Sequence, residues 1–236
     1  INAFGGEFYE VIIGGAAFNK EVENFFKKMN FPFTVGYGMT ECAPIIAYDD
    51  WKTEKLYSCG KAAVNMEMRI DSSDPANVPG EIQIKGANVF LGYYKNEDAT
   101  KEVFTDDGWF RTGDMGVIDE DGCLFIKGRT KCMILGPSGQ NIYPEEVETV
   151  VNSQPYVVDS LVIEDNGGLT ALIYPDFAAG ARDGMNQETF VKYMEGTLPE
   201  LNKELPNYAK LKKIEVMSED FERTPKKSIK RYLYQR

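Results

Sequence analysis

The sequence has 236 residues, 43% of them hydrophobic, which is enough chain for one large or two modest domains with a buried core. Its formal net charge is -11 at pH 7, with the acidic residues dispersed, and this excludes a general nucleic-acid-binding surface. Histidine is absent, which excludes histidine-based hydrolysis, histidine-ligated zinc and histidine acid–base catalysis from this chain.

Cysteine spacing and hydropathy bear on the compartment. Cys42, Cys59, Cys123 and Cys132 show no metal-ligand spacing and no sign of an oxidising environment, so a reducing cytoplasm is expected. No apolar run approaches the roughly 18 residues that span a bilayer, and no signal-peptide pattern is present. The chain starts with Ile1 and opens directly on a predicted strand, so we expect a piece cut from a longer protein.

The N-terminal segment predicts a strand–helix–strand unit. An apolar run at 9–13 ends at Gly14-Gly15, and residues 20–29 place apolar side chains on one helical face. A second strand is predicted at 33–35, followed by Gly36-Tyr37-Gly38. This succession favours an α/β sheet, in which binding sites lie beyond the C-terminal ends of the strands.

From about residue 60 to residue 128 the pattern changes to short strands separated by Gly, Pro and Asp turns, which indicates a β-rich subdomain. The predicted strands are 67–70, 81–85, 116–119 and 124–127. The segment Asp119–Gly122 predicts a hairpin, because glycine accepts the positive φ that such a turn requires.

The remaining hundred residues predict a small α+β domain. Helices are expected at 144–152 and 187–205, and strands at 157–164, 169–174 and 211–217. The predicted fold class is therefore α/β and α+β: the end of a large domain, then a small α+β domain.

Two short motifs suit a nucleotide site. Gly15, Ala16 and Ala17 follow the first strand, and small residues there let the backbone approach a flat ligand. The second motif offers an aromatic ring for a purine, a hydroxyl for a phosphate oxygen and a carboxylate for Mg²⁺. It consists of Gly36, Tyr37, Gly38, Met39, Thr40 and Glu41. Each motif also has a purely structural interpretation, as a tight turn and as a capped helix.

The second motif resembles the core motif of the adenylate-forming superfamily, which includes acyl-CoA synthetases, peptide-synthetase adenylation domains and firefly luciferase. The resemblance continues in order with Pro79–Gly86 and Gly92–Tyr94, which look like the family's β-subdomain motif. Gly108–Asp114 looks like the segment whose aspartate binds both ribose hydroxyls, a task for which a carboxylate is the natural acceptor. We expect Asp114 at the end of a strand, where an ordinary turn cap is the simpler interpretation.

The segment Gly128–Lys131 resembles the family's hinge motif. The resemblance implies that Arg129 contacts the nucleotide and that Lys131 is the pivot about which the small domain rotates between adenylation and thioester formation. It sets the expected domains at 1–129 and 130–236. Many relatives carry Asp after the pivot, where this chain has Cys132.

The segment from Leu135 to Pro144 resembles the loop that faces the pantetheine channel after rotation. It contains Ser138 and Gly139, and the resemblance implies that Gly139 leaves room for the thiol arm of CoA. Without the resemblance, this stretch is a turn before a helix.

The family's last motif is a C-terminal lysine that contacts the carboxylate and the α-phosphate during adenylation. The matching string is Thr224–Arg231, and alignment on Thr-Pro and Ile puts Ser228 at the lysine position. Either Lys227 or Lys230 supplies the charge instead, or adenylation is weak; a solvated basic tail is the structural alternative. We assign the catalytic roles to Thr40, Glu41, Lys131 and Lys227.

The motif forms look most like those of fatty acyl-CoA ligases, particularly the long-chain group. This implies fatty acid, ATP and CoA as substrates, AMP as the bound nucleotide, and Mg²⁺ held near Glu41, with no nucleic-acid partner. A long-chain substrate also implies transient membrane contact, while nothing indicates the oligomeric state. The alternatives are an acyl-carrier-protein ligase of the same superfamily and a catalytically silent nucleotide- or acyl-binding module. Because the family's phosphate loop has no counterpart in this sequence, we expect this chain alone to be inactive in adenylation.

Overall fold

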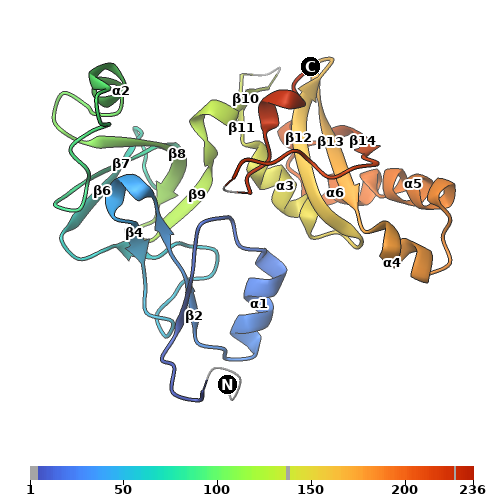
Figure 1. The fold of residues 1–236 in the computed structure, drawn as a ribbon, viewed down its shortest axis with the longest axis horizontal. Helices are drawn as coiled ribbons and strands as arrows, with labels where there is room; N and C mark the ends of the chain where they lie inside the picture. The colour runs from blue at the N-terminus through green and yellow to red at the C-terminus, as the bar shows by residue number, and fades with distance from the viewer. Residues whose placement is uncertain (1–4, 137–138, 226) are drawn as a thin grey trace. The chain divides into compact units, whose positions relative to one another are not determined.

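The computed structural model describes residues 5–136, 139–225 and 227–236 (Figure 1). The chain divides into two compact units, Ile1–Lys131 and Cys132–Arg236, called unit 1 and unit 2 below. No helix in the described part of the chain is both long enough and apolar enough to cross a bilayer.

The described part of unit 1 contains small sheets, the α-helices α1 and α2, and short 3-10 helices. Its elements are β1 (Val11–Ile13), α1 (Lys20–Lys28), β2 (Phe33–Val35), β3 (Tyr37–Gly38), a 3-10 helix (Thr40–Cys42), β4 (Ile45–Tyr48), β5 (Lys61–Ala62), β6 (Met66–Asp71), β7 (Gly80–Gly86), α2 (Glu97–Glu102), β8 (Phe110–Ile118) and β9 (Leu124–Arg129). A further 3-10 turn spans Thr130–Cys132.

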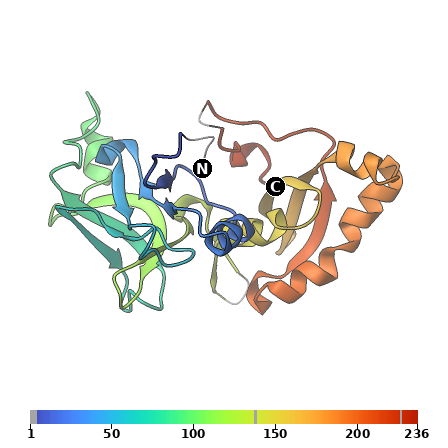
Figure 2. The same cartoon turned by 90° about the horizontal axis from the view of Figure 1, so that it is seen from below.

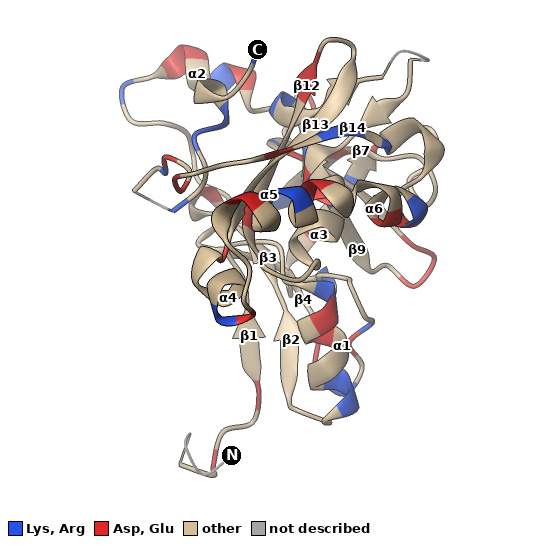
Figure 3. Cartoon of the chain, turned by 90° about the vertical axis from the view of Figure 1, so that its right-hand side faces the viewer, with Lys and Arg blue, Asp and Glu red and all other residues tan. Residues whose placement is uncertain are grey.

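The strand–helix–strand prediction at the start of the chain is confirmed. β1 and β2 pair in parallel, and α1 connects them. The Asn19 side chain caps the helix by accepting hydrogen bonds from the backbone amides of Glu21 and Val22. Acidic residues lie in the first turn of α1 and basic residues in its last turn, as its macrodipole favours (Figure 3).

The buried side of α1 differs from the predicted apolar face. Val22, Phe25 and Met29 are exposed, whereas the carboxylate-bearing Glu23 is only 2% exposed. Glu23 accepts a 2.5 Å hydrogen bond from the backbone amide of Tyr57. A local need for an acceptor therefore places a polar side chain on the inner side of this helix, which hydrophobic periodicity does not reveal.

The predicted β-rich subdomain is an antiparallel four-stranded sheet with the order β6-β7-β8-β9, beside a three-stranded sheet β3-β4-β5. The core of unit 1 includes Phe33, Ile46, Ile82, Phe110 and Leu124, so both sheets and β2 contribute to it. The predicted hairpin is present between β8 and β9, where Asp119 and Cys123 are joined by a backbone hydrogen bond.

Unit 2 is an α+β unit. Its elements are β10 (Ile134–Leu135), β11 (Asn141–Ile142), α3 (Pro144–Asn152), β12 (Val157–Asp165), β13 (Gly168–Pro175), α4 (Phe177–Arg182), α5 (Gln187–Gly196), α6 (Leu198–Glu204), a 3-10 helix (Asn207–Ala209), β14 (Leu211–Val216) and a last 3-10 turn (Arg231–Leu233). β12 and β13 are antiparallel, and β13 and β14 are parallel.

Both faces of the β12–β13–β14 sheet are covered. Helices α3, α5 and α6 pack on one face of the sheet (Figure 2). The apolar cluster on that face includes Val162 and Ile173 of the strands and Phe190 and Leu201 of the helices. The other face carries Leu161, Ile163 and Leu172, and the C-terminal segment covers it with Phe221, Ile229 and Tyr234. The alternating strand residues thus feed two separate apolar layers, because successive side chains point to opposite faces of a sheet.

Three details depart from the predicted elements. The single helix expected at 187–205 is two helices, since Pro199 lies in the first turn of α6 and cannot continue the hydrogen bonding of α5. The short helix α4 was not predicted. Asp114, expected at the end of a strand, lies inside β8 beside an irregularity in the strand pairing. That expectation was wrong because the glycine before Asp114 bends the strand without ending it.

Candidate functional site

The loops that follow β1 and β2 lie side by side, as two parallel neighbouring strands require. The backbone amide of Gly36 donates to the carbonyl of Ile13 over 2.8 Å. A Cβ on Gly14 would sit 3.2 Å from the Gly36 carbonyl oxygen, so the two glycine backbones touch. The structure therefore brings the segment with Gly15, Ala16 and Ala17 next to the motif that starts at Gly36, and leaves Gly15–Ala17 exposed.

The motif after β2 turns sharply through β3 and the following 3-10 helix. A Cβ on Gly38 would lie 2.1 Å from the backbone oxygen of Pro44, so only glycine is accommodated there. The Met39 amide donates to that same oxygen, and the Met39 side chain packs partly on the core. Thr40 begins the 3-10 helix with an exposed side chain. The turn thus places Thr40 at the surface, directly after a backbone segment that is held by Pro44.

The centre of the candidate site is the carboxylate of Asp114. The Tyr37 hydroxyl donates to its Oδ2 over 2.6 Å, and the Nε of Arg129 lies 3.3 Å from its Oδ1. Asp114 and Arg129 are direct partners across β8 and β9. The side chain of Asp114 is 12% exposed and that of Arg129 is 68% exposed. A buried carboxylate is therefore held between a buried phenol and an arginine that is open to solvent.

Burial dominates the electrostatics of this group. It raises the pKa of Asp114, although the hydrogen bond from Tyr37 and the charge of Arg129 oppose the shift. Burial and the nearby Asp114 charge together raise the pKa of Tyr37, so its hydroxyl stays protonated and remains a donor. The ring of Tyr37 is 8% exposed, so its hydrogen bond to Asp114 is its main visible role, which the sequence did not indicate.

Glu41 lies in the 3-10 helix after β3. The Tyr93 hydroxyl donates to its Oε1 over 3.1 Å, and the Glu41 backbone oxygen accepts from the amide of Phe90. These contacts join the core motif to the Gly92–Tyr94 segment, so Tyr93 is a site neighbour that motif order alone did not single out. Among the described residues, no group of three or more Cys, Asp or Glu side chains could hold a metal ion.

The remaining predicted residues of the hinge and loop follow β9 in the chain. Lys131 lies in the 3-10 turn after β9 with an exposed side chain. Gly139 lies in the turn that joins β10 to β11, where its amide donates to the Gly136 carbonyl and open space lies beside its Cα. Ser138 lies outside the described residues.

The C-terminal segment forms a small hairpin in unit 2. Arg223 and Ile229 form an antiparallel bridge, and the Thr224 amide donates to the Ser228 carbonyl over 2.8 Å. Lys227 lies at the turn with φ of 64° and an exposed side chain. Within the described residues its ammonium group makes no hydrogen bond or ion pair, whereas the Lys230 ammonium lies 3.0 Å from Glu222. The turn therefore leaves Lys227 open to a ligand and engages Lys230.

A buried ion pair holds the end of this hairpin, and sequence analysis did not identify it. Arg231 contacts the carboxylate of Glu148 in α3 and lies 3.8 Å from Glu145. Glu148 also accepts a hydrogen bond of 2.7 Å from the backbone amide of Val162 in β12. Burial raises the pKa of Glu148, and the Arg231 guanidinium opposes that shift. The pair thus links helix, sheet and C-terminal segment at one point.

Two family models match this chain in order. Residues 3–94 match the model described as AMP-binding enzyme, and residues 133–236 match the AMP-binding enzyme C-terminal domain. The chain therefore belongs to the adenylate-forming superfamily of AMP-binding enzymes, as its motifs predicted.

Within this superfamily the similar proteins include CoA ligases of two kinds. The chain is 34% identical to a long-chain-fatty-acid–CoA ligase of Mycobacterium bovis over 163 residues, which is 69% of the chain and 26% of that protein. It is 37% identical to a 2-succinylbenzoate–CoA ligase of Bacillus cytotoxicus over 158 residues, which is 65% of the chain and 32% of that protein. The match thus spans about a third or less of these relatives.

Solved structures agree with this placement. The Bacillus subtilis o-succinylbenzoate CoA synthetase in complex with its acyl-adenylate intermediate matches 99% of this chain and 48% of that chain, with a TM-score of 0.79 and 26% identity. ATP-bound MatB from Rhodopseudomonas palustris matches 95% of this chain and 44% of that chain, with a TM-score of 0.76 and 28% identity. The predicted fold class, with parts of an N-terminal and a C-terminal domain, is confirmed.

Proposed function

We propose that this chain is part of an AMP-forming acid–CoA ligase. A carboxylate attacks the α-phosphate of ATP to give acyl-AMP and pyrophosphate, and the CoA thiol then displaces AMP. The observation that carries the proposal is the Asp114 carboxylate, held by Tyr37 and Arg129 in a chain whose relatives are CoA ligases.

Asp114 is the proposed reader of the ribose. Each carboxylate oxygen can accept two hydrogen bonds, so the contacts with Tyr37 and Arg129 leave lone pairs for the two ribose hydroxyls. Arg129 is the proposed nucleotide contact beside it, because its exposed guanidinium is neutralised on one side only. The small backbone of Gly15–Ala17, next to Gly36, suits close approach of the flat base.

Glu41 is the proposed ligand of Mg²⁺. A single carboxylate suits this ion, because Mg²⁺ is usually bound by one or two carboxylates together with substrate phosphates and water. Tyr93 fixes the Glu41 carboxylate through Oε1. The bound ion would neutralise charge on the transferring phosphates. Thr40, exposed on the same 3-10 helix, is the proposed hydroxyl donor to a phosphate oxygen.

Lys227 is the proposed cation of the adenylation step. It stands on a turn and is exposed, and among the residues that the structure describes it has no carboxylate partner, whereas Glu222 pairs with Lys230. A free ammonium can stabilise negative charge as it develops on the α-phosphate and the attacking carboxylate. Lys131 is the proposed pivot, and the segment with Ser138 and Gly139 is proposed to face CoA in the second step.

Long-chain fatty acid is the proposed carboxylate, and 2-succinylbenzoate is the alternative that the relatives raise. A silent binding module stays a second candidate, because Ser228 stands where the family has its catalytic lysine. A reducing cytoplasm is the proposed compartment, because the spacing of the four cysteines is not that of a disulfide framework.

The test uses the complete polypeptide that carries this chain. Palmitate and 2-succinylbenzoate are each supplied with ATP, Mg²⁺ and CoA, and both pyrophosphate and acyl-CoA are measured. Asp114→Ala should lower kcat/KM for ATP by about 100-fold. Asp106→Ala is the matched control, because Asp106 is exposed and makes no hydrogen bond or ion pair within the described residues. If wild type forms neither product with any carboxylate, the silent module replaces the ligase.

A further inference from the structure

The strand that carries Asp114 is bulged where it passes β7. In the register of β7 and β8, Glu81 pairs with Met115 and Gln83 pairs with Arg111. Ile82 alone therefore faces Thr112, Gly113 and Asp114. Such bulges bend a strand and re-aim the side chains at the bend. The direction of the Asp114 carboxylate consequently depends on what holds this bulge in shape.

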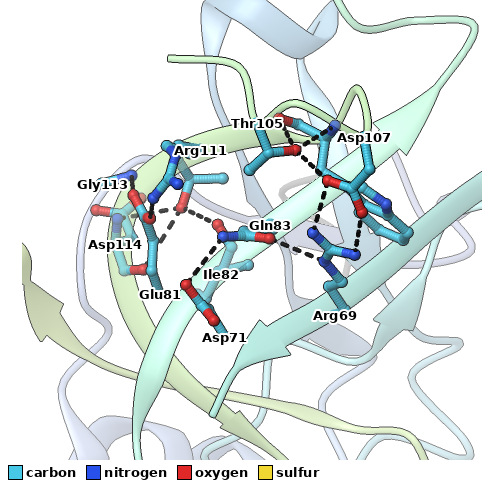
Figure 4. Close-up of polar contacts among 12 residues, drawn as sticks. Arg69, Asp71, Glu81, Ile82, Gln83, Thr105, Asp107, Arg111, Gly113 and Asp114 are labelled. Atoms are coloured by element: carbon cyan, nitrogen blue, oxygen red, sulfur yellow. Dashed lines mark hydrogen bonds and ion pairs between the residues drawn. The ribbon is translucent and has the colours of Figure 1, made fainter. Parts of the chain in front are cut away.

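The carboxylate of Glu81 spans the bulge (Figure 4). Its Oε1 accepts the backbone N–H of Gly113 over 3.2 Å, and its Oε2 lies 3.1 Å from the Arg111 guanidinium. The Glu81 side chain is 18% exposed, so water screens these contacts only partly. Gly113 has φ of 73°, a conformation that glycine adopts without strain, and it lies outside the residue pairs of the β7–β8 ladder. Glu81 replaces the backbone acceptor that this N–H loses.

Thr112 closes the bulge from the other side. Its hydroxyl donates to the Ile82 carbonyl over 2.8 Å and accepts from the Asp114 amide over 3.1 Å. Side chains thus hold the N–H groups of two consecutive peptide units: Glu81 holds that of Gly113, and Thr112 holds that of the Gly113–Asp114 peptide bond. A displaced Gly113 would rotate that bond and swing the carboxylate that follows it.

The far end of the bulge is braced by a second polar group. The Arg69 guanidinium makes two contacts with Asp107, at 2.7 and 3.1 Å, and lies over the Trp109 ring. Its Nε donates over 2.8 Å to the buried amide of Gln83, the residue that pairs with Arg111. Arg69 and Gln83 thus hold the bulge at Arg111, and Glu81 holds it at Gly113 (Figure 4).

We propose that Glu81 is a positioning residue for ribose recognition: it fixes the Gly113 backbone and thereby aims the Asp114 carboxylate at the ribose hydroxyls. This inference rests on the proposed ribose role of Asp114. Glu81 touches no substrate in this arrangement and acts through the bulge. Its loss should therefore weaken discrimination between ribose and 2′-deoxyribose, which a general loss of stability would leave unchanged.

The experiment measures equilibrium dissociation constants of AMP and 2′-deoxy-AMP by calorimetry in the complete polypeptide. The ratio of the two constants reports recognition of the 2′-hydroxyl without requiring catalysis. Asp114→Ala should bring the ratio close to one. Glu81→Ala should lower the ratio about tenfold, because misaligned hydrogen bonds to a charged acceptor are lost. If the wild-type ratio is itself less than about ten, it should fall to one. Glu81→Gln should preserve more of the ratio, since the amide oxygen can still accept the Gly113 N–H.

Glu67→Ala is the matched control. Glu67 is an exposed glutamate of β6 in the same sheet, and its side chain makes no hydrogen bond or ion pair within the part of the chain that is described, so the ratio of this variant should equal that of wild type. If Asp114→Ala abolishes the ratio and Glu81→Ala leaves it intact, the positioning role is wrong while the ribose role stands. If Asp114→Ala also leaves it intact, the ribose role itself is wrong, and the inference falls with it.

Discussion

Asp114 in unit 1 and Lys227 in unit 2 represent two ways of presenting a charged group. Asp114 is buried, and both of its oxygens are engaged by neighbouring side chains. Lys227 is exposed on a turn, and within the described residues its ammonium group makes no hydrogen bond or ion pair. Under the proposed roles, Asp114 binds the ribose throughout the reaction and gains from preorganisation, whereas Lys227 is needed in the adenylation step only and can be presented on an exposed turn.

The largest effect, a loss of stability, is expected at the Arg231–Glu148 ion pair of unit 2. Glu148→Ala would remove the direct carboxylate partner of the partly buried Arg231 guanidinium and leave it the more distant Glu145, 3.8 Å away, and breaking such a pair costs about 3–5 kcal/mol. We expect the free energy of unfolding of unit 2 to fall by that amount in urea, followed by far-UV circular dichroism. Both tryptophans, Trp51 and Trp109, lie in unit 1, so tryptophan fluorescence should report an unchanged transition there.

Glu195→Ala is the control for this measurement, since it removes an exposed glutamate from α5 and should change the stability by less than about 0.5 kcal/mol. Equal losses in the two variants would mean that the Arg231–Glu148 pair does not anchor the C-terminal segment.

The next effect concerns Lys227 itself. Lys227→Ala should slow the adenylation step by about 100-fold, which is about 2.7 kcal/mol of barrier, without measurable loss of stability. Lys230→Ala should leave the rate within about threefold, because its ammonium pairs with Glu222. The measurement is ATP–pyrophosphate exchange in the complete polypeptide. A larger loss in Lys230→Ala would reassign the cation to that residue.

A smaller effect is expected at Tyr37. Tyr37→Phe removes a buried donor to Asp114, and a hydrogen bond to a charged group contributes about 1.5–3 kcal/mol. Tyr9→Phe is the matched control, because the Tyr9 hydroxyl makes a bond of the same 2.6 Å length to Asp50, but at the surface. Thermal or urea unfolding followed by tryptophan fluorescence should show a clear loss for Tyr37→Phe alone. Similar losses in both variants would contradict the preorganisation of Asp114.

The smallest effect is a pH dependence of nucleotide binding. Asp114 must be ionised to accept both ribose hydroxyls, and burial raises its pKa above the ordinary value of 3.8. AMP affinity should therefore weaken as the pH falls through this raised pKa, at a higher pH than an exposed aspartate would give. Asp114→Asn should remove that dependence between about pH 4 and 7, as measured by calorimetry. An identical pH profile in the variant would show that another group titrates.

The sequence predicted the elements that have strong local signals. The helix α3 and the strand β2 were predicted with the bounds that the structure shows, since Pro144 marks a helix start and Phe33–Val35 is a compact apolar run. The break before Pro199 was missed because residues 187–205 otherwise follow one helical pattern. Glu23 lies on the buried side of α1 because it accepts a hydrogen bond from the Tyr57 backbone, a tertiary contact that hydrophobic periodicity cannot show.

The candidate site was predicted residue by residue, but not its connections. Motif order indicated Tyr37, Asp114 and Arg129 separately, whereas their contact depends on the register of β8 and β9 and on the position of β3. The roles of Glu81 and Glu148 were not visible for the same reason. Their partners lie a full strand or helix away, and an acidic residue in an element looks like a solvated side chain in the sequence alone.

The two apolar layers on the faces of the β12–β13–β14 sheet also constrain the order in which the parts of unit 2 can fold. Phe221, Ile229 and Tyr234 cover one face of that sheet, so one apolar layer is complete only when the residues up to 234 are present. During synthesis those residues leave the ribosome after the strands and helices have emerged. Until then Leu161, Ile163 and Leu172 remain uncovered. An apolar sheet face exposed in this interval can associate with chaperones or with other nascent chains.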